Sequence, residues 1–360
     1  MSPTPRTRRC SSASCVALTE TAVTRYIARR LLMMVGILLG VLTITFLLGR
    51  VLPGSPVEMM LGAKPTPEQI EAAREELGLD RPLPEQFAVY VWNAVQGDLG
   101  TSLRTGRAVS AEILQRMTAT LELVTIAMLI AVAVGVPLGV ISAVRRDSWR
   151  DHSARVFSIA GMALPVFLVG MLLQMIFYGW LDWLPLQGRI DRNILLDHEF
   201  KAITGFYLVD TALAGDGAAF RSALSHMALP VATLALAALA TVTRISRNMM
   251  IEALGEDFVR TAHAYGLPAR TIHYRYALKA TLIPLLTVIG LTYGYMLGGS
   301  VVVEFVFDWP GLGAYIVGSL INNDFPAVMG VTLFLATSYL LVNLIVDLLY
   351  YVVDPRLRQP

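Results

Sequence analysis

Six apolar runs without a charged residue divide this chain, and each is long enough to cross a membrane as a helix. They cover residues 31–49, 123–144, 156–181, 227–243, 280–303 and 325–346. A helix of about 20 residues spans the hydrocarbon core of a bilayer. Since 55% of the 360 residues are apolar and only 16% are charged, we predict an all-α integral membrane protein with six transmembrane helices. This composition excludes a secreted enzyme, a disulfide scaffold and a nucleic-acid binder.

The distribution of charge predicts the orientation of these spans, because basic residues near spans stay on the cytoplasmic side. An even number of spans puts both termini on one side. Segments 1–30, 145–155, 244–279 and 353–360 would share that side, and they carry 18 Arg and Lys against 7 Asp and Glu. The segments on the other side carry 11 basic and 18 acidic residues. The chain is therefore predicted to be N-in and C-in.

The loops between the runs are unequal in length. We expect a disordered cytoplasmic extension over 1–24, a first transmembrane helix over 25–52, an extracytoplasmic region over 53–118, a membrane core over 119–353 and a cytoplasmic tail over 354–360. The core includes a cytoplasmic loop, 244–279, and an extracytoplasmic loop, 182–226. Thr66 and Pro67 open a predicted surface helix that Gly78 closes, and residues 204–210 predict a short hairpin or helix.

The cytoplasmic loop 244–279 has a helical pattern that breaks at residues 266–268. Its first helix carries apolar side chains at positions i, i+4 and i+7, which are Phe258, Ala262 and Tyr265. A helix lying on the membrane surface is one interpretation, but such helices carry a dense Lys/Arg face, whereas Glu256 and Asp257 open this one. A short amphipathic helix closed by Gly-x-Pro is better suited to a groove on another protein.

This loop also resembles a known family. The stretch Asp257-Phe-Val-Arg-Thr-Ala-His-Ala-Tyr-Gly-Leu267 is similar to the coupling-helix loop of ABC importer permeases, in the peptide branch that has Arg-Thr-Ala where other importers have Glu-Ala-Ala. Tyr276-Ala-Leu-Lys279 replaces the Ile-x-Leu-Pro of sugar and amino-acid importers. Further matches include Leu52-Pro-Gly-Ser-Pro-Val57, Gly97-Asp-Leu-Gly-Thr-Ser102 and Trp309-Pro-Gly-Leu-Gly313. From Arg25 onward the chain resembles the B-type permease subunit of dipeptide and oligopeptide importers.

The resemblance implies a type I ABC importer permease fold in the bacterial inner membrane. The implied partners are a second homologous permease subunit, two ATPase subunits, an extracytoplasmic binding protein, membrane lipid and a peptide substrate. ATP and Mg would sit on the ATPase subunits, with no cofactor in this chain. ATPase coupling would fall to the residues of the loop, namely Glu256, Asp257, Phe258, Val259, Arg260, Thr261, Ala262, His263, Ala264, Tyr265, Gly266, Leu267 and Pro268.

Other functions are less well supported by the residues. A phosphate-binding loop needs a Gly-Lys pair, but none of the three lysines, Lys64, Lys201 and Lys279, follows a glycine. The chain is therefore not expected to be an enzyme. A self-contained channel or secondary carrier is an alternative, although we find no inverted repeat of the kind typical of carriers. The same machinery importing nickel or other metal chelates, or glycosides, is a second alternative.

Candidates for the substrate path come from ionisable and hydroxyl-bearing residues in the runs. They are Glu122, Thr292, Tyr293, Tyr295, Ser300 and Asp347. Glu122 could instead form a structural pair with Arg116, and Asp347 one with Arg356. Gly298 and Gly299 favour tight helix packing. Pro165 and Pro284 are expected to kink their helices.

Overall fold

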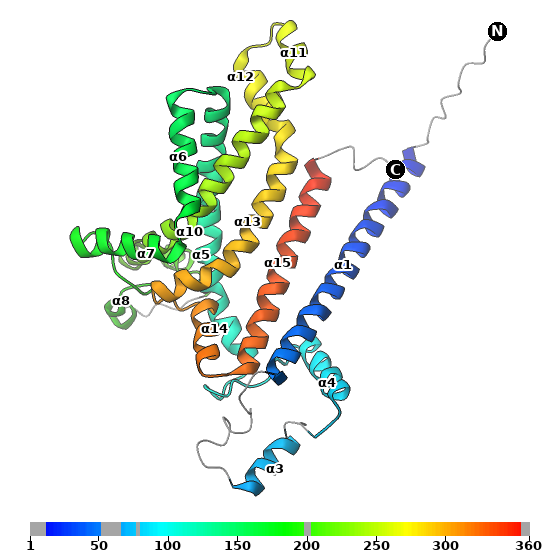
Figure 1. The fold of residues 1–360 in the computed structure, drawn as a ribbon, viewed down its shortest axis with the longest axis vertical. Coiled ribbons are helices and arrows are strands. Elements are labelled where there is room, and N and C mark those ends of the chain that lie inside the picture. The colour runs from blue at the N-terminus through cyan, green and yellow to red at the C-terminus, as the bar shows by residue number, and fades with distance from the viewer. Residues whose placement is uncertain (1–11, 52–65, 77–79, 198–202, 354–360) are drawn as a thin grey trace, which may run out of the picture.

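The computed structural model describes residues 12–51, 66–76, 80–197 and 203–353 (Figure 1). These ranges are helical apart from turns and one isolated antiparallel bridge between Thr101 and Ala108. The described part of the chain contains no strand of a sheet. The all-α prediction is confirmed.

Five long helices run the length of the molecule and are apolar enough to cross a membrane (Figure 1). They are α1 (Ser12–Val51), α5 (Val109–Val144), α10 (Gly217–Gly255), α13 (Leu278–Val306) and α15 (Phe325–Val353). Each contains one of the predicted runs. Helix α10 extends beyond its apolar run at both ends, so part of the predicted loop 182–226 is helix. Helix α1 includes residues 12–24, which we assigned to a disordered extension.

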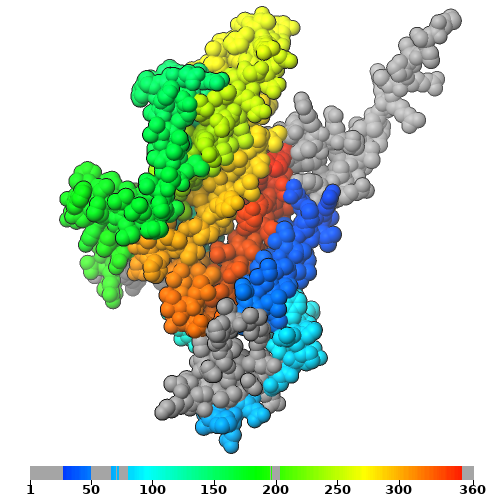
Figure 2. All heavy atoms as spheres, viewed as in Figure 1, coloured from blue at the N-terminus to red at the C-terminus, as the bar shows by residue number. Residues whose placement is uncertain are grey.

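The remaining run, 156–181, forms a bent pair rather than a straight helix. Helix α6 (Trp149–Ala163) ends at Leu164, and α7 (Val166–Gln174) begins after Pro165 and continues as the π-helix η1 (Met175–Trp180). The two parts meet at 101°. Proline disfavours helical geometry at the residue before it, and Leu164 is extended, with ψ 130°. The sixth span exists if this pair is counted as one, and it forms an angled edge of the molecule (Figure 2).

The core lies between α5 and α10, the most extensive helix pair. Small residues let the two backbones approach closely. A Cβ on Gly139 would lie 2.7 Å from the carbonyl oxygen of Thr243, and one on Gly135 would lie 3.0 Å from Val242 Cγ1. Because real Cβ atoms do not sit so close to backbone, glycine is required at position 139. This seam fixes α10, which carries the cytoplasmic loop.

The two ends of the bundle differ in what they carry. The turn between α5 and α6, the loop after α10, the start of α1 and the end of α15 lie at one end (Figure 1). Helices α4 (Leu83–Val95) and α14 (Leu312–Ile321) lie at the other. The first end contains the segments that are rich in Arg and Lys, so it is cytoplasmic.

Several short helices fill the extracytoplasmic segments. They are α3 (Pro67–Glu76), α8 (Arg192–Asp197) and α9 (Tyr207–Leu213). Thr66 and Gln69 cap α3 reciprocally, since each side chain accepts a bond from the other's backbone N–H, at 3.3 and 2.9 Å. The predicted helix start is confirmed, whereas Gly78 lies outside the described residues. The prediction of a hairpin or helix over 204–210 is met by a turn that leads into α9.

Candidate coupling surface and translocation path

The cytoplasmic loop folds into a compact helical turn. Glu256 is extended and separates α10 from α11 (Asp257–Ala264), which is followed by α12 (Ala269–Thr271) and the π-helix η2 (Ile272–Ala277) that leads into α13. The buried side chains Val259 and Ala262 of α11 pack with Ile272, and Leu267 covers them. Through this small core, α11 packs on η2, which leads directly into α13.

The opposite side of α11 is exposed and partly aromatic. Phe258 is 39% exposed and Tyr265 is 82% exposed, seven residues apart. The sequence pattern grouped both with Ala262, but Ala262 faces the small core instead. A cleft of about 460 Å³ opens beside Phe258, between α10 and α13. Large exposed aromatic side chains at the cytoplasmic tip are typical of a protein-binding surface.

Gly266 ends α11 in a left-handed conformation, with φ 71°. The N–H of Gly266 donates to the carbonyl of His263 at 2.9 Å, and that of Leu267 donates to the carbonyl of Ala262 at 3.2 Å. These bonds form a Schellman motif, and glycine takes this conformation at the lowest cost. A Cβ at Gly266 would meet nothing within 4 Å. A side chain placed there would therefore project from the surface of the turn.

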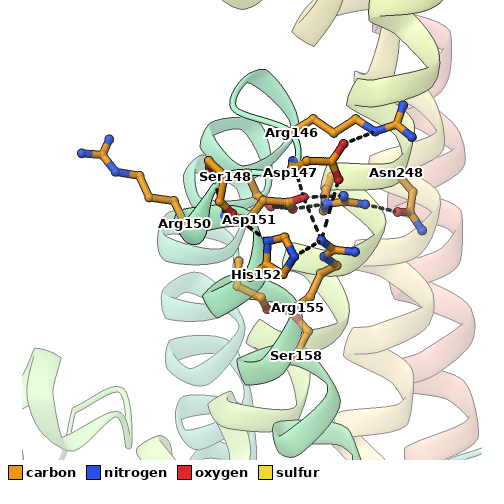
Figure 3. A network of polar contacts seen from close by, with 12 residues as sticks. Arg146, Asp147, Ser148, Arg150, Asp151, His152, Arg155, Ser158 and Asn248 are labelled. Carbon is orange, nitrogen blue, oxygen red and sulfur yellow. Dashed lines mark hydrogen bonds and ion pairs between the residues drawn. The ribbon is translucent and has the colours of Figure 1, made fainter.

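A buried carboxylate ties the base of α10 to the turn between α5 and α6 (Figure 3). Arg247 of α10 donates to both oxygens of Asp151, from Nε at 2.5 Å and from Nη2 at 2.8 Å. Ser142 at the end of α5 donates to Asp151 at 2.5 Å, and the backbone N–H of Asp147 at 3.0 Å. The Asp151–Arg247 pair thus joins α5, α6 and α10 about three helical turns before α11 begins.

A second buried carboxylate organises the extracytoplasmic end. Glu304 of α13 accepts bonds from the Thr120 hydroxyl at 2.8 Å and from the N–H of Gly313 at 2.6 Å. Ser300 and the N–H of Ala314 donate at 3.2 and 3.3 Å. The carboxylate therefore sits at the N-terminus of α14, where backbone donors are unsatisfied and the helix dipole favours negative charge.

The Trp309-Pro-Gly-Leu-Gly313 motif explains how α14 comes so close to Glu304. The Trp309 indole donates to the carbonyl of Ala119 at 3.0 Å and is fully buried. A Cβ on Gly311 would lie 2.3 Å from a Glu304 oxygen, and one on Gly313 would lie 2.5 Å from the Cα of Val301. Both glycines are needed for this contact.

Two family models match the chain. The model for the binding-protein-dependent transport system inner membrane component matches residues 135–359, more than half of the sequence. This chain belongs to that family. The model for the N-terminal part of such membrane components matches residues 23–124 of the permease. The permease is therefore a multi-pass protein of the inner membrane. It has the type I ABC permease fold.

Full-length relatives support the same assignment. The probable D,D-dipeptide transport system permease of Escherichia coli (strain K12) is 46% identical over 88% of this chain and 93% of its own length. The di/tripeptide transport system permease of Pseudomonas aeruginosa (strain UCBPP-PA14) is 43% identical over 92% and 98%. The dipeptide transport system permease of Escherichia coli (strain K12) is 41% identical over 93% and 98%.

The permease does not bring the predicted path residues together. Glu122 is buried near the extracytoplasmic end, where it accepts bonds from Arg189 and from the N–H of Leu208. Its partner is Arg189 and not Arg116. Ser300 is buried against Glu304, so neither residue has a free face. Asp347 lies near the other end of the bundle and pairs with Arg30 of α1 at 2.9 Å, while Arg356 lies outside the described residues.

The other three path candidates share helix α13. Tyr295 is 81% exposed, and Gly298, one turn further along, has nothing within 4 Å of a Cβ position. Thr292 is half-buried, and the hydroxyl of Tyr293 is 3.0 Å from that of Thr125 on α5. Tyr295 therefore lies on an open face of α13, and Tyr293 lies at the contact of α13 with α5.

The sequence patterns did not predict three features of these sites, namely Glu304, Arg189 and the Asp151–Arg247 pair. Glu304 follows the apolar run 280–303 by one residue, and extending that window would have added it to the intramembrane carboxylates. Arg247 was counted only as a cytoplasmic charge. Among the residues that the structure describes, no three His, Cys, Asp or Glu side chains gather as a metal site would require.

Proposed function

We propose that this permease is one of two membrane subunits of an ATP-driven importer of dipeptides and oligopeptides. The observation that carries the proposal is the agreement of relatives named as dipeptide or di/tripeptide permeases, at 41–46% identity over 88–93% of the chain. A second permease subunit, two ATPase subunits and an extracytoplasmic binding protein would complete the machine. ATP and Mg would bind the ATPase subunits.

The α11 turn is the proposed coupling element, and it comprises residues 256–268. Its exposed aromatics, Phe258 and Tyr265, would seat in a cleft of an ATPase subunit. Closure of the two ATPase subunits on ATP would then move α11 as a rigid lever, because its inner face is packed on Ile272. The Asp151–Arg247 pair would pass that movement from α10 to α5 and α6, and η2 would pass it to α13. The spans would tilt and open outward.

The proposed path lies along the open face of α13. Tyr295 and Gly298 present an aromatic ring beside a smooth backbone surface. A second permease facing this surface would enclose a channel whose far wall it supplies. We expect Tyr295→Ala to change which peptides compete for uptake while the amount of protein in the membrane stays at the wild-type level. Unchanged competition by all peptides tested would remove Tyr295 from the path.

Uptake in cells tests the proposal as a whole. Cells that lack this gene, and the same cells with the gene restored, receive a labelled L-tripeptide or labelled D-alanyl-D-alanine, with and without ATP depletion. Uptake that requires both the gene and ATP supports the importer and its cargo together. Uptake that survives ATP depletion would instead indicate a secondary carrier or a channel. If deletion changes the uptake of neither peptide, the cargo is a metal chelate, a glycoside or another small molecule.

A further inference from the structure

A cavity of about 210 Å³ lies between α6 and α10 at the cytoplasmic end of the bundle. Arg155, Ser158 and Ile159 line it from α6, and Thr243, Arg244 and Arg247 line it from α10. The sequence changes character at this level on both helices. Thr243 is the last residue of one apolar run and Arg244 the first charge after it, whereas Arg155 is the last charge before the run 156–181. The cavity therefore lies at the polar boundary of the membrane.

Two polar atoms around this cavity have no partner among the described residues. The hydroxyl of Thr243 is buried without a hydrogen bond, although threonines in helices usually donate to the preceding turn. The Nε of Arg155 is also buried and unpaired. Buried polar atoms are nearly always satisfied in native proteins. These two donors together point to an acceptor that occupies the cavity in the membrane.

The charge around the cavity favours an anion. Three guanidinium groups line it, and Asp151 is the buried carboxylate beside them. Arg247 donates two hydrogen bonds to Asp151. The Nη2 of Arg155 lies 3.4 Å from the same carboxylate. The exposed Arg244 has no carboxylate within ion-pair distance in the part of the chain that the structure describes. Even with the exposed Asp147, which lies 3.9 Å from Arg155, the three arginines outnumber the two carboxylates.

Apolar surface leads away from this cationic cavity. Ile159 and Met162 follow Arg155 along one side of α6, at spacings of four and three residues. Both are exposed large apolar side chains. These two side chains form an apolar stripe that runs along α6 toward the bend at Pro165, deeper in the membrane. Trp149, at the start of α6, is exposed at the level where indole rings favour the headgroup region.

We propose that this cavity binds the phosphate group of an anionic phospholipid from the cytoplasmic leaflet. The phosphate oxygens accept from Arg244, from Arg155 Nε and from the Thr243 hydroxyl. One acyl chain lies along Ile159 and Met162. Basic pockets between transmembrane helices on the cytoplasmic side suit such headgroups. Since Arg247 contributes to both the cavity and the Asp151 pair, the lipid braces α6 against α10 at the point where movement of α11 would enter the bundle.

Lipid retention by the purified permease, with the subunits that copurify with it, tests this site. The protein is exposed to equal amounts of phosphatidylglycerol and phosphatidylcholine, and the retained lipids are counted by native mass spectrometry. Wild type is expected to keep phosphatidylglycerol preferentially. Arg244→Gln should lower its retention about fivefold, the effect of one basic residue at an anionic surface. Thr243→Val should lower it less.

Arg150→Gln is the matched control, because Arg150 also lies on α6 but points away from the network (Figure 3). It should leave retention unchanged. Equal loss in Arg150→Gln and Arg244→Gln would reduce the effect to general surface charge and overturn the site. Equal retention of the two lipids by wild type would do the same. If millimolar inorganic phosphate displaces the lipid, the cavity takes a free anion and the lipid assignment fails.

Discussion

The two ends of this permease are held together by different chemistry. At the extracytoplasmic end, Glu304 is fully buried, and its donors among the described residues are all neutral: two hydroxyls and two backbone N–H groups. At the cytoplasmic end, Asp151 is buried as well, but its main partner Arg247 reaches the surface. The Glu304 site is closed by neutral hydrogen bonds and glycine contacts, and the ion pair at the same end, Arg189 with Glu122, is buried. The Asp151 site is closed by an ion pair at the edge of solvent.

The difference indicates which end can move. Water cannot replace the neutral donors of Glu304 unless α14 moves away, because the close contacts at Gly311 and Gly313 leave no space for a water molecule. An ion pair at a partly exposed arginine can open and close, because water can solvate the guanidinium as it leaves. We therefore expect damage at the extracytoplasmic end to reduce folding, and damage at the cytoplasmic end to reduce coupling as well as stability.

Glu304→Leu should be the most destabilising of these changes. It leaves the Thr120 hydroxyl and two backbone N–H groups without their acceptor, whereas Ser300 can still donate to the carbonyl of Leu297. Each buried group without an acceptor costs about 1–3 kcal/mol. A loss of about 4 kcal/mol or more would prevent most of the protein from accumulating, as measured by detergent-solubilised monodisperse protein. Glu304→Gln keeps one acceptor oxygen and should cost much less. Equal accumulation of both variants would show that Glu304 does not hold this end.

Asp151→Ala should cost about 3 kcal/mol, because it leaves Arg247 partly buried without its carboxylate. The double variant Asp151→Ala with Arg247→Met removes both charges and should recover part of the loss. Thermal unfolding of the purified permease measures stability, and peptide uptake measures coupling. We expect the double variant to regain stability more than uptake. Recovery of both together would assign the pair to stability alone.

Gly313→Ala should cost about 2 kcal/mol, since the new methyl would force the backbone of α13 and α14 apart. Gly298→Ala on the neighbouring helix α13 provides the control, because a Cβ there meets open space. That control should be stabilising by about 0.5–1 kcal/mol, the helix preference of alanine over glycine. The melting temperatures should therefore shift in opposite directions, and shifts of the same sign would contradict the close approach at Gly313.

Gly266→Asp should have the smallest effect on stability and a large effect on transport. Aspartate is one of the side chains that tolerate a left-handed conformation, and the Cβ position is open, so the protein should insert and fold. The carboxylate would project from the turn that carries the exposed aromatics. We expect uptake to fall at least about tenfold, the consequence of roughly 1.4 kcal/mol lost in docking. Normal uptake by this variant would contradict the proposed coupling role of the loop.

The sequence did not predict which distant residues pair with the charged side chains inside the membrane. Glu122 was selected as a candidate for the substrate path, but its nearest basic neighbour in sequence, Arg116, is not its partner. Arg189 reaches it from 67 positions away because the extracytoplasmic loop folds back over α5. The apolar runs, by contrast, depend only on local composition, and they predicted the positions of five spans directly.

The bend at Pro165 and the turn at Gly266 were likewise predicted only in part, because their geometry depends on packing against other helices. Pro165 predicted a break in the third run, because a proline acts on the residue next to it. Its angle of 101° depends on what α6 and α7 pack against, which no local pattern contains. In the cytoplasmic loop, spacing grouped Phe258 with Ala262. The closure of the turn by Gly266 brought Val259 and Ala262 inward instead, through the contact with Ile272.

The contact between α1 and α15 can form only after the last span has been synthesised. Helix α1 is the first span to leave the ribosome, yet its main neighbour is the last one, and the ion pair between Arg30 and Asp347 joins positions near opposite ends of the chain. At translation rates of about 5–20 residues per second, α1 waits roughly 15–60 s in the bilayer for that neighbour. During this interval, the face of α1 that α15 covers in the finished fold is exposed to lipid, and the Arg30–Asp347 ion pair is not yet formed.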